Sequence, residues 1–298
     1  MNADSFLAIG KTHHICQDYV RVHDPEGKAK PFCLLSDGCS ASPDTDIGAR
    51  FLVLAAERER LHRGWFFNDD LLPGSAGHDI TASESCLIVL DNAMDLVQDA
   101  RLSLLCLDAT LLSLVPDDKY ILASIIGDGV IAARRRDGTI ESWVVDFPEG
   151  APGYLSYLID DKRLKHFCDK YGAKTVKHML GGKVLHDVEA RMTYEAPPPD
   201  ETKGTASGVS FDVCLDPAEY DFVAIFSDGI QSFVRETKPK NFEAVPLDEV
   251  LAQVMAIKGS AGEFVTRRCR RFQKFCLENK WQHNDDFSMA AIWCGSQE

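Results

Sequence analysis

The amino-acid sequence predicts an α+β protein in which antiparallel sheets are covered by helices. Two observations predict this fold: short apolar runs separated by tight turns over 102–145, and longer segments with a helical period on either side of them. A last apolar run over 287–293 closes the chain as a strand. With 298 residues, of which 45% are hydrophobic, the chain is long enough to bury a sizeable core.

The first half of the chain predicts a strand, two helices and a group of strands. An apolar strand over 31–36 precedes a helix over 44–63, in which Ile47, Phe51 and Leu54 recur at helical spacing. A second amphipathic helix follows over 81–101. Four short strands with turn sequences between them then predict an antiparallel meander, at 107–115, 119–127, 130–136 and 139–145.

The second half begins with a segment of a different character. Residues 148–208 start and end in stretches rich in proline and glycine, and their central part, 155–171, predicts a helix. We expect this segment to be a variable surface insertion, or flap, within a single domain that spans 1–298. A strand over 222–226, two helices over 247–258 and 263–280, and the final strand complete the chain.

Composition limits the partners and the compartment. A net charge of −14 argues against a nucleic-acid partner and suits hard cations. The ten cysteines include no C-x-x-C pair, which favours buried thiols in a reducing compartment and hence a cytoplasmic protein. No basic segment followed by an apolar stretch opens the chain, and no apolar run approaches 18 residues, so we expect neither secretion nor a membrane partner.

Two apolar runs end in the same tripeptide. Residues 32–35 lead into Ser36-Asp37-Gly38, and residues 222–226 lead into Ser227-Asp228-Gly229. One Asp-Gly after a strand is usually a hairpin turn. Its recurrence after a second apolar run instead indicates that each strand delivers a carboxylate to a shared site, where the glycine lets the backbone carbonyl approach the same ligand.

Further aspartates occupy comparable positions at strand ends or in tight turns. The whole set is Asp18, Asp37, Asp128, Asp228 and Asp285. Carboxylates and a backbone carbonyl, without soft ligands, suit Mg²⁺ or Mn²⁺ and not zinc. Gathered at one edge, such acids would repel each other strongly unless cations were bound. A pair of cations there can produce hydroxide near neutral pH and hold a phosphoryl group for in-line attack.

A dinucleotide site is a competing interpretation of one segment. Gly127-Asp128-Gly129 and Ala132 match G-x-G-x-x-A after a strand. However, Asp128 would direct a negative charge at the pyrophosphate, and Asp137-Gly138 interrupts the chain too soon for a crossover helix. We therefore prefer the metal-site interpretation.

The ordered motifs resemble those of the metal-dependent serine/threonine protein phosphatases of the 2C type, in a divergent, bacterial-like form. The matches, in family order, are Gln17-Asp18, Asp37-Gly38, Ala109-Thr110-Leu111-Leu112 leading to Gly127-Asp128-Gly129, Ser227-Asp228-Gly229 and Asp285-Asp286-Phe287-Ser288. The resemblance implies a four-layer α-β-β-α sandwich of two antiparallel sheets flanked by helices. It also implies hydrolysis of phosphoserine or phosphothreonine in proteins by a metal-bridging hydroxide, without a phosphoenzyme, opposite a cognate kinase.

The resemblance also implies roles for the acids. Asp37 would bridge two Mn²⁺ or Mg²⁺ ions, and Asp228 and Asp285 would complete the first. Asp18 and the Gly38 carbonyl would serve the second. Asp128 would share a weak third ion with Asp228.

Three positions depart from the family pattern. His13 stands where relatives have an arginine that holds the substrate phosphate, so we predict that His13, or failing it His14, makes this contact. Cys39 stands where some relatives have a histidine proposed as general acid, which leaves water to protonate the leaving group. Asp286 replaces a common asparagine, so either Asp285 or Asp286 is the ligand.

These departures keep a second hypothesis open, a degenerate phosphatase-like module that binds a phosphorylated partner without turnover. The complete acid set favours the enzyme, in which Asp37, Asp228 and His13 are the predicted catalytic residues.

Overall fold

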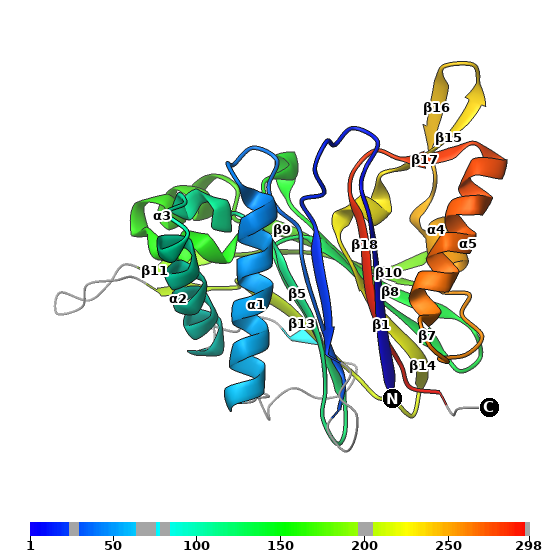
Figure 1. Ribbon diagram of the computed structural model, residues 1–298, viewed down its shortest axis with the longest axis horizontal. Coiled ribbons are helices and arrows are strands. Elements are labelled where there is room, and N and C mark those ends of the chain that lie inside the picture. The colour runs from blue at the N-terminus through cyan, green and yellow to red at the C-terminus, as the bar shows by residue number, and fades with distance from the viewer. Residues whose placement is uncertain (24–29, 64–75, 78–83, 196–204, 296–298) are drawn as a thin grey trace.

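The chain is described by a computed structural model that covers residues 1–23, 30–63, 76–77, 84–195 and 205–295. Its elements form the four layers of an α-β-β-α sandwich (Figure 1), which confirms the expected fold class. Helices α1 (Thr45–Arg63) and α2 (Glu84–Asp99) cover a six-stranded sheet. Helices α4 (Leu247–Val254) and α5 (Phe264–Asn279) cover a seven-stranded sheet on the other side.

Both large sheets are antiparallel throughout. The six-stranded sheet has the order β2-β3-β5-β6-β13-β4, and its strands are β2 (Tyr19–His23), β3 (Phe32–Ser36), β4 (Ala76–Gly77), β5 (Leu111–Pro116), β6 (Ile121–Ile126) and β13 (Ser210–Leu215). The seven-stranded sheet has the order β1-β18-β14-β7-β8-β9-β10, and its strands are β1 (Asn2–Ala8), β7 (Gly129–Arg135), β8 (Ile140–Asp146), β9 (Ala173–Leu180), β10 (Lys183–Arg191), β14 (Tyr220–Phe226) and β18 (Phe287–Trp293).

The two-residue period of the central strands explains why the layers stack. In β14, Phe222 and Phe226 face the core under α4 and α5, whereas Val223 and Ile225 face the core between the sheets. Strand β18 divides its side chains in the same way and packs over β3, while β14 packs over β5. Both faces of β14 and β18 are apolar, so these strands must be covered by helices on one side and by the other sheet on the opposite side.

The predicted meander over 107–145 is wrong in one respect. Strands β5 and β6 pair, and so do β7 and β8, but β6 and β7 belong to different sheets. The chain crosses between the sheets at Gly127-Asp128-Gly129, where both glycines adopt positive φ angles of 92° and 142°. A side chain at Gly129 would also lie 2.9 Å from the Phe226 carbonyl oxygen. Turn sequences predict where strands end, but not which sheet receives the next one.

The described parts of the segment 148–208 contain strands as well as the predicted helix. Its predicted helix consists of a short 3₁₀ turn, Leu155–Ile159, and α3 (Asp161–Lys170), which Asp160 caps. Strands β9 and β10 then extend the seven-stranded sheet at its edge, and β11 (Thr193–Glu195) pairs with β12 (Thr205–Ser207). The assignment of 1–298 to one domain with a variable insertion stays a prediction.

A small third sheet lies at one end of the sandwich. It joins β15 (Phe233–Lys238), β16 (Asn241–Ala244) and β17 (Trp281–His283), and the hairpin of β15 and β16 projects from the body (Figure 1). Within the described ranges, no helix has the length and apolar character needed to span a bilayer.

Candidate active site

Four of the five predicted acids line one cavity. Asp37 follows β3, Asp228 follows β14, Asp285 lies just before β18, and Asp128 occupies the turn that crosses from β6 to β7. They surround a cavity of about 260 Å³ together with Gly38. The strand ends therefore bring together residues that are far apart in the chain, as the sequence motifs predict.

The fifth acid, Asp18, lies buried behind this cavity with 3% of its surface exposed. The Ser227 hydroxyl donates a hydrogen bond of 2.8 Å to its Oδ2, while its Oδ1 has no partner among the described residues. Burial raises the pKa of Asp18 to about 7, and the charge of Asp286 acts in the same direction. Asp18 lies close enough to Asp37 for the charges of the two carboxylates to interact.

Burial and mutual repulsion also raise the pKa values of the other acids. The pKa of Asp37 is raised well above its usual value by burial and then by the charges of Asp18 and Asp228. Burial, followed by the charge of Asp228, raises the pKa of Asp128 to about 8. Burial also raises the pKa of Asp228, whose Oδ1 has no partner within the described residues. Such a cluster requires protons or bound cations.

The donor chemistry of the cluster fits a hard divalent cation. Four aspartates and Gly38 line the cavity, and two buried carboxylate oxygens, of Asp18 and Asp228, lack partners in the described ranges. In those same ranges, no three His, Cys, Asp or Glu side chains converge tightly enough to hold an ion unaided. A backbone carbonyl and water would therefore have to complete the coordination.

The structure separates the two adjacent acids that the sequence could not distinguish. Asp286 is buried, and its carboxylate accepts hydrogen bonds from the backbone N–H groups of Gly10 (2.7 Å) and Gln17 (2.6 Å). Asp285 is more exposed and lines the cavity. Asp286 therefore holds the 10–17 loop that leads to Asp18, and Asp285 is the acid available to a ligand.

His13 lies beside these two acids and outside the residues that line the cavity. Its Nδ1 is 3.0 Å from Oδ2 of Asp286 and its Nε2 is 3.4 Å from Oδ1 of Asp285. Burial alone would lower the pKa of His13, but contact with Asp286 and the charges of both acids raise it overall. The imidazole is thus engaged with carboxylates, and its predicted contact with phosphate stays a prediction. His14 is exposed.

Sequence reasoning missed the contribution of segment 148–208 to the cavity wall. Gly150, Pro152 and Tyr154 line the cavity, and the Tyr154 hydroxyl contacts Cys39. Burial, reinforced by Cys39, raises the pKa of Tyr154, so its phenol stays neutral and can donate a hydrogen bond. No motif marks this tyrosine in the sequence. Asp146, at the end of β8, adds further negative charge near Asp128 and Asp228.

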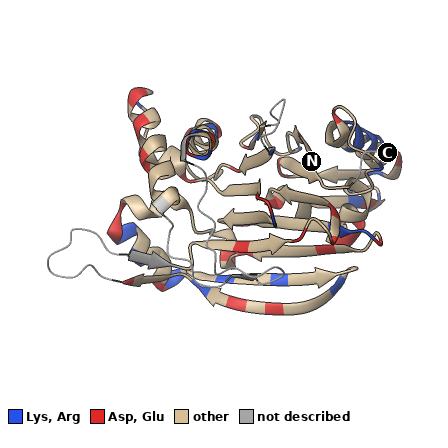
Figure 2. Ribbon diagram, turned by 90° about the horizontal axis from the view of Figure 1, so that it is seen from below, with Lys and Arg blue, Asp and Glu red and all other residues tan. Residues whose placement is uncertain are grey.

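A cluster of basic residues lies apart from the cavity. Its members are on α5, in the outer helical layer, where basic residues recur along the helix (Figure 2): Arg267, Arg268, Arg270, Arg271 and Lys274. This position is typical of a solvated helix face.

The fold is that of solved bacterial phosphatases. A bacterial serine phosphatase matches with a TM-score of 0.56 at 12% identity, over 100% of this chain and 99% of its own. The serine/threonine phosphatase Stp1 from Staphylococcus aureus matches with a TM-score of 0.52 at 12% identity, over 99% of this chain and 95% of its own. No curated protein matches the sequence.

The family profile of Protein phosphatase 2C matches residues 10–265. The chain therefore belongs to the Protein phosphatase 2C family, as its motifs indicate.

Proposed function

We propose that the protein hydrolyses phosphoserine and phosphothreonine in protein substrates with the help of Mn²⁺ or Mg²⁺. The observation that carries this proposal is the convergence of Asp37, Asp128, Asp228 and Asp285 on one cavity, with Asp18 directly behind it. Membership of the Protein phosphatase 2C family supports the reaction class.

In this proposal each acid has a role that follows the family pattern. Asp37, Asp228 and Asp285 would hold a first cation, and Asp37, Asp18 and the Gly38 carbonyl would hold a second. Asp128 and Asp228 would hold a weak third cation, which would keep most of its water ligands. When bound, such cations neutralise the carboxylates, polarise phosphoryl oxygens and lower the pKa of water.

Hydrogen bonds position two of these acids. The Asp37 backbone N–H donates to Thr110 Oγ1 (3.0 Å), and the Thr110 N–H donates to the Asp37 carbonyl (2.8 Å). The Ser288 N–H donates to Ser227 Oγ (3.1 Å), whose own proton goes to Asp18. These contacts preorganise the carboxylates, which reduces the cost of ordering them when the phosphoryl group arrives.

The remaining steps concern the phosphate and the leaving group. Tyr154 can donate its phenolic proton to a phosphate oxygen from the cavity wall. His13 would have to leave Asp285 before it could contact phosphate. With Cys39 where some relatives have a histidine, protonation of the leaving group falls to water.

We also propose a cytoplasmic location and a cognate serine/threonine kinase as the source of the substrates. All ten cysteines are free, which supports a reducing compartment.

The decisive experiment compares hydrolysis of a phosphothreonine peptide with and without Mn²⁺. We expect turnover only with the metal and none in the Asp37→Asn variant. Absence of turnover in the folded, Mn²⁺-loaded parent protein would contradict the proposal.

A second candidate function is a binding module without turnover. Two observations favour it: no three ligand-type side chains of the described ranges lie close enough together to hold an ion unaided, and His13 is engaged with Asp285 and Asp286. Saturable binding of the same phosphopeptide, with no phosphate release at saturating Mn²⁺, would identify this function.

A further inference from the structure

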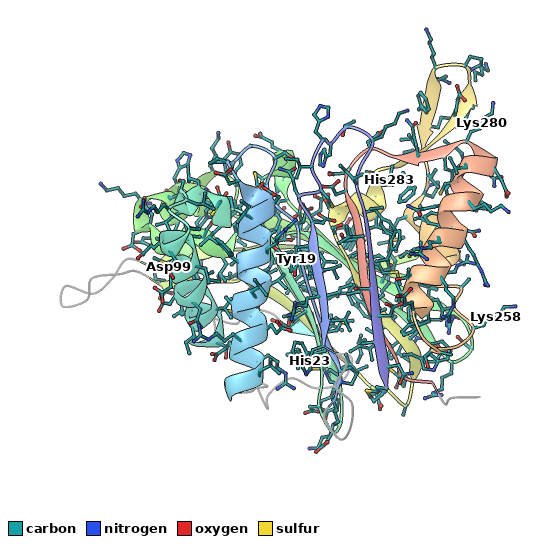
Figure 3. All side chains as sticks on the ribbon, in the orientation of Figure 1. Tyr19, His23, Asp99, Lys258, Lys280 and His283 are labelled. Carbon is teal, nitrogen blue, oxygen red and sulfur yellow. The ribbon has the colours of Figure 1, made fainter. Side chains whose placement is uncertain are left out.

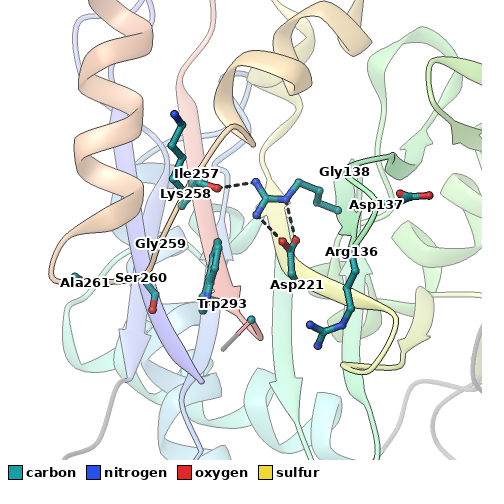
Figure 4. Close-up of a pocket in the computed structure, with 12 residues that line it drawn as sticks. Arg136, Asp137, Gly138, Asp221, Ile257, Lys258, Gly259, Ser260, Ala261 and Trp293 are labelled. Atoms are coloured by element: carbon teal, nitrogen blue, oxygen red, sulfur yellow. Dashed lines mark hydrogen bonds and ion pairs between the residues drawn. The ribbon is translucent and has the colours of Figure 1, made fainter. Parts of the chain in front are cut away.

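A second, wider hollow of the described molecule lies at the end opposite the acids, and Figure 4 shows the residues that line it. Its volume is about 970 Å³, against about 260 Å³ for the acid cavity. Its walls come from the first residues of β14, the last residues of β18 and the loop after α4. Figure 3 labels Lys258 in that loop and His283 near the acid end, and the seven residues of β14 separate the sites by roughly 20 Å.

In one wall of this hollow, a buried arginine is held by several hydrogen bonds. Arg134 donates to both carboxylate oxygens of Asp221, at 2.8 and 2.9 Å, and to the carbonyls of Met255 (2.8 Å) and Ile257 (2.7 Å). Its guanidinium also lies over the rings of Phe222 and Trp293. Four contacts hold this cation in place, so the wall is preformed before any ligand binds.

A second wall carries a hydrogen-bond donor without an acceptor. Trp293 is 7% exposed, and its indole Nε1 has no hydrogen-bond partner in the described part of the chain. An unpaired buried N–H destabilises the fold, so an acceptor that reaches it is favoured. A Cβ at Gly295 would lie 2.9 Å from this Nε1, so the backbone of Gly295 packs directly against the indole edge and tolerates no side chain there.

The charge balance of the hollow differs from that of the molecule. With Arg134 and Asp221 neutralising each other, Arg136 and Lys258 face Asp137 alone, in a protein of net charge −14. Arg136 donates to the carbonyls of Ala218 and Pro217. Lys258 makes no ion pair within the described residues. The unpaired charge is therefore positive.

We propose that this hollow binds a small organic anion, with one carboxylate or phosphate group on a flat apolar body. The anionic group would accept a hydrogen bond from the Trp293 N–H and lie near Arg136 and Lys258, and the apolar body would lie along the indole edge. The volume is within the range of small-molecule sites. This inference is independent of the proposed hydrolysis, because it uses none of the acids of the other end.

The test is a titration of the ¹⁵N-labelled full-length protein with phenylphosphonate, followed through the tryptophan indole N–H signals. Metal is removed with EDTA and then dialysed away, so that the uncompensated acids repel the anion from the other cavity. The chain has four tryptophans, and Trp293→Phe assigns the signal of interest. We expect a saturable shift of the Trp293 signal only, and binding at least about tenfold weaker for inorganic phosphate and for benzyl alcohol.

Two glycines of the same hollow form a matched pair of variants. Gly295→Ala places a methyl group against the indole and should weaken binding at least about tenfold. Gly259→Ala meets no atom within 4 Å and should leave binding unchanged. Asp37→Asn, in the other cavity, should also leave it unchanged.

Three outcomes would overturn the proposal: no shift of the Trp293 signal, equal binding by the two glycine variants, or loss of binding in Asp37→Asn. A fourth outcome that would overturn the proposal comes from deletion of residues 296–298. If the deletion itself shifts the Trp293 signal, and the anion binds only after the deletion, the chain's own end occupies the hollow in the parent. Unchanged binding after the deletion supports the proposal.

Discussion

The two ends of strands β14 and β18 carry acids in opposite circumstances. At one end, Asp228 and Asp285 join Asp37 and Asp128 around a small cavity, and none of the four pairs with lysine or arginine in the described residues. At the other end, Asp221 is held by both arms of Arg134. The same sheet thus presents carboxylates at both ends. The presence of a neighbouring arginine at one end, and its absence among the described residues at the other, distinguishes the two groups.

The difference predicts opposite responses to mutation. An acid that lacks a counter-charge destabilises the metal-free fold, so its removal should cost function and not stability. Removal of an acid that is already paired leaves its arginine buried without a counter-charge, so it should cost stability. Four predictions follow this contrast, from the largest effect to the smallest.

Asp37→Asn and Asp228→Asn should each reduce turnover on the order of 10³-fold or more at saturating Mn²⁺, because the cation positions lose a shared ligand. The metal-free variants should be as stable as the parent or slightly more stable, because a repelling charge is gone. Phosphopeptide kinetics and urea denaturation in EDTA measure the two effects. Asp169→Asn, in an exposed pair with Lys165, is the control and should change neither. Near-parental activity in either variant would remove the acid from the site.

Asp221→Asn should destabilise the protein by about 3 kcal/mol, because it leaves the Arg134 guanidinium largely buried without its counter-charge. Glu249→Gln is the matched control, since it breaks an arginine–glutamate pair that is more exposed on both sides. That change should cost no more than about 0.5 kcal/mol. Urea denaturation at constant pH compares them, and equal costs would show that Asp221 is not a structural acid.

The stability of the metal-free protein should fall as pH rises. The folded chain raises the pKa of Asp18 from 3.8 to about 7 and that of Asp128 to about 8, so it retains protons that the unfolded chain releases. The contribution of these two groups to the free energy of unfolding is therefore fully present below about pH 4, and it is lost as the pH rises to about 8. His13, whose pKa is also raised, acts in the same direction.

We expect this fall to be on the order of several kcal/mol and to shrink in Asp37→Asn or with Mn²⁺ present, since the cation replaces the protons. Denaturation at several pH values, with and without Mn²⁺, measures it. A stability that rises over this range in the parent but not in Asp37→Asn would mean that the cluster is not a set of uncompensated acids.

Tyr154→Phe should have the smallest effect, lowering kcat about threefold to tenfold with little change in KM. The ring that closes the cavity remains, and one hydrogen bond to the phosphate is lost. Tyr157→Phe, in the same segment but outside the cavity wall, is the control. If both variants match the parent, Tyr154 only closes the cavity.

Much of the scaffold of the site follows from local sequence. The apolar strands that end at Asp37 and Asp228, and the final strand after Asp285, lie where the sequence places them. Apolar periodicity and Asp-Gly turns act over a few residues, so the sequence alone predicts them. Helices α1 and α5 are predictable for the same reason.

Contacts between distant segments decide the rest. Asp285 and Asp286 are identical neighbours, and only the N–H groups of Gly10 and Gln17, from the other end of the chain, assign them different tasks. The change of sheet at Asp128 and the entry of Tyr154 into the cavity wall are likewise long-range events.

The sequence by itself therefore determined the fold class, the strand ends and the set of acids, because those depend on local pattern. Only the tertiary structure decided which acid faces the cavity, which is paired with arginine, and which buried indole N–H is left without an acceptor in the described residues. Those outcomes depend on burial and on neighbours supplied by other segments, which set the cost of each charge and each hydrogen bond.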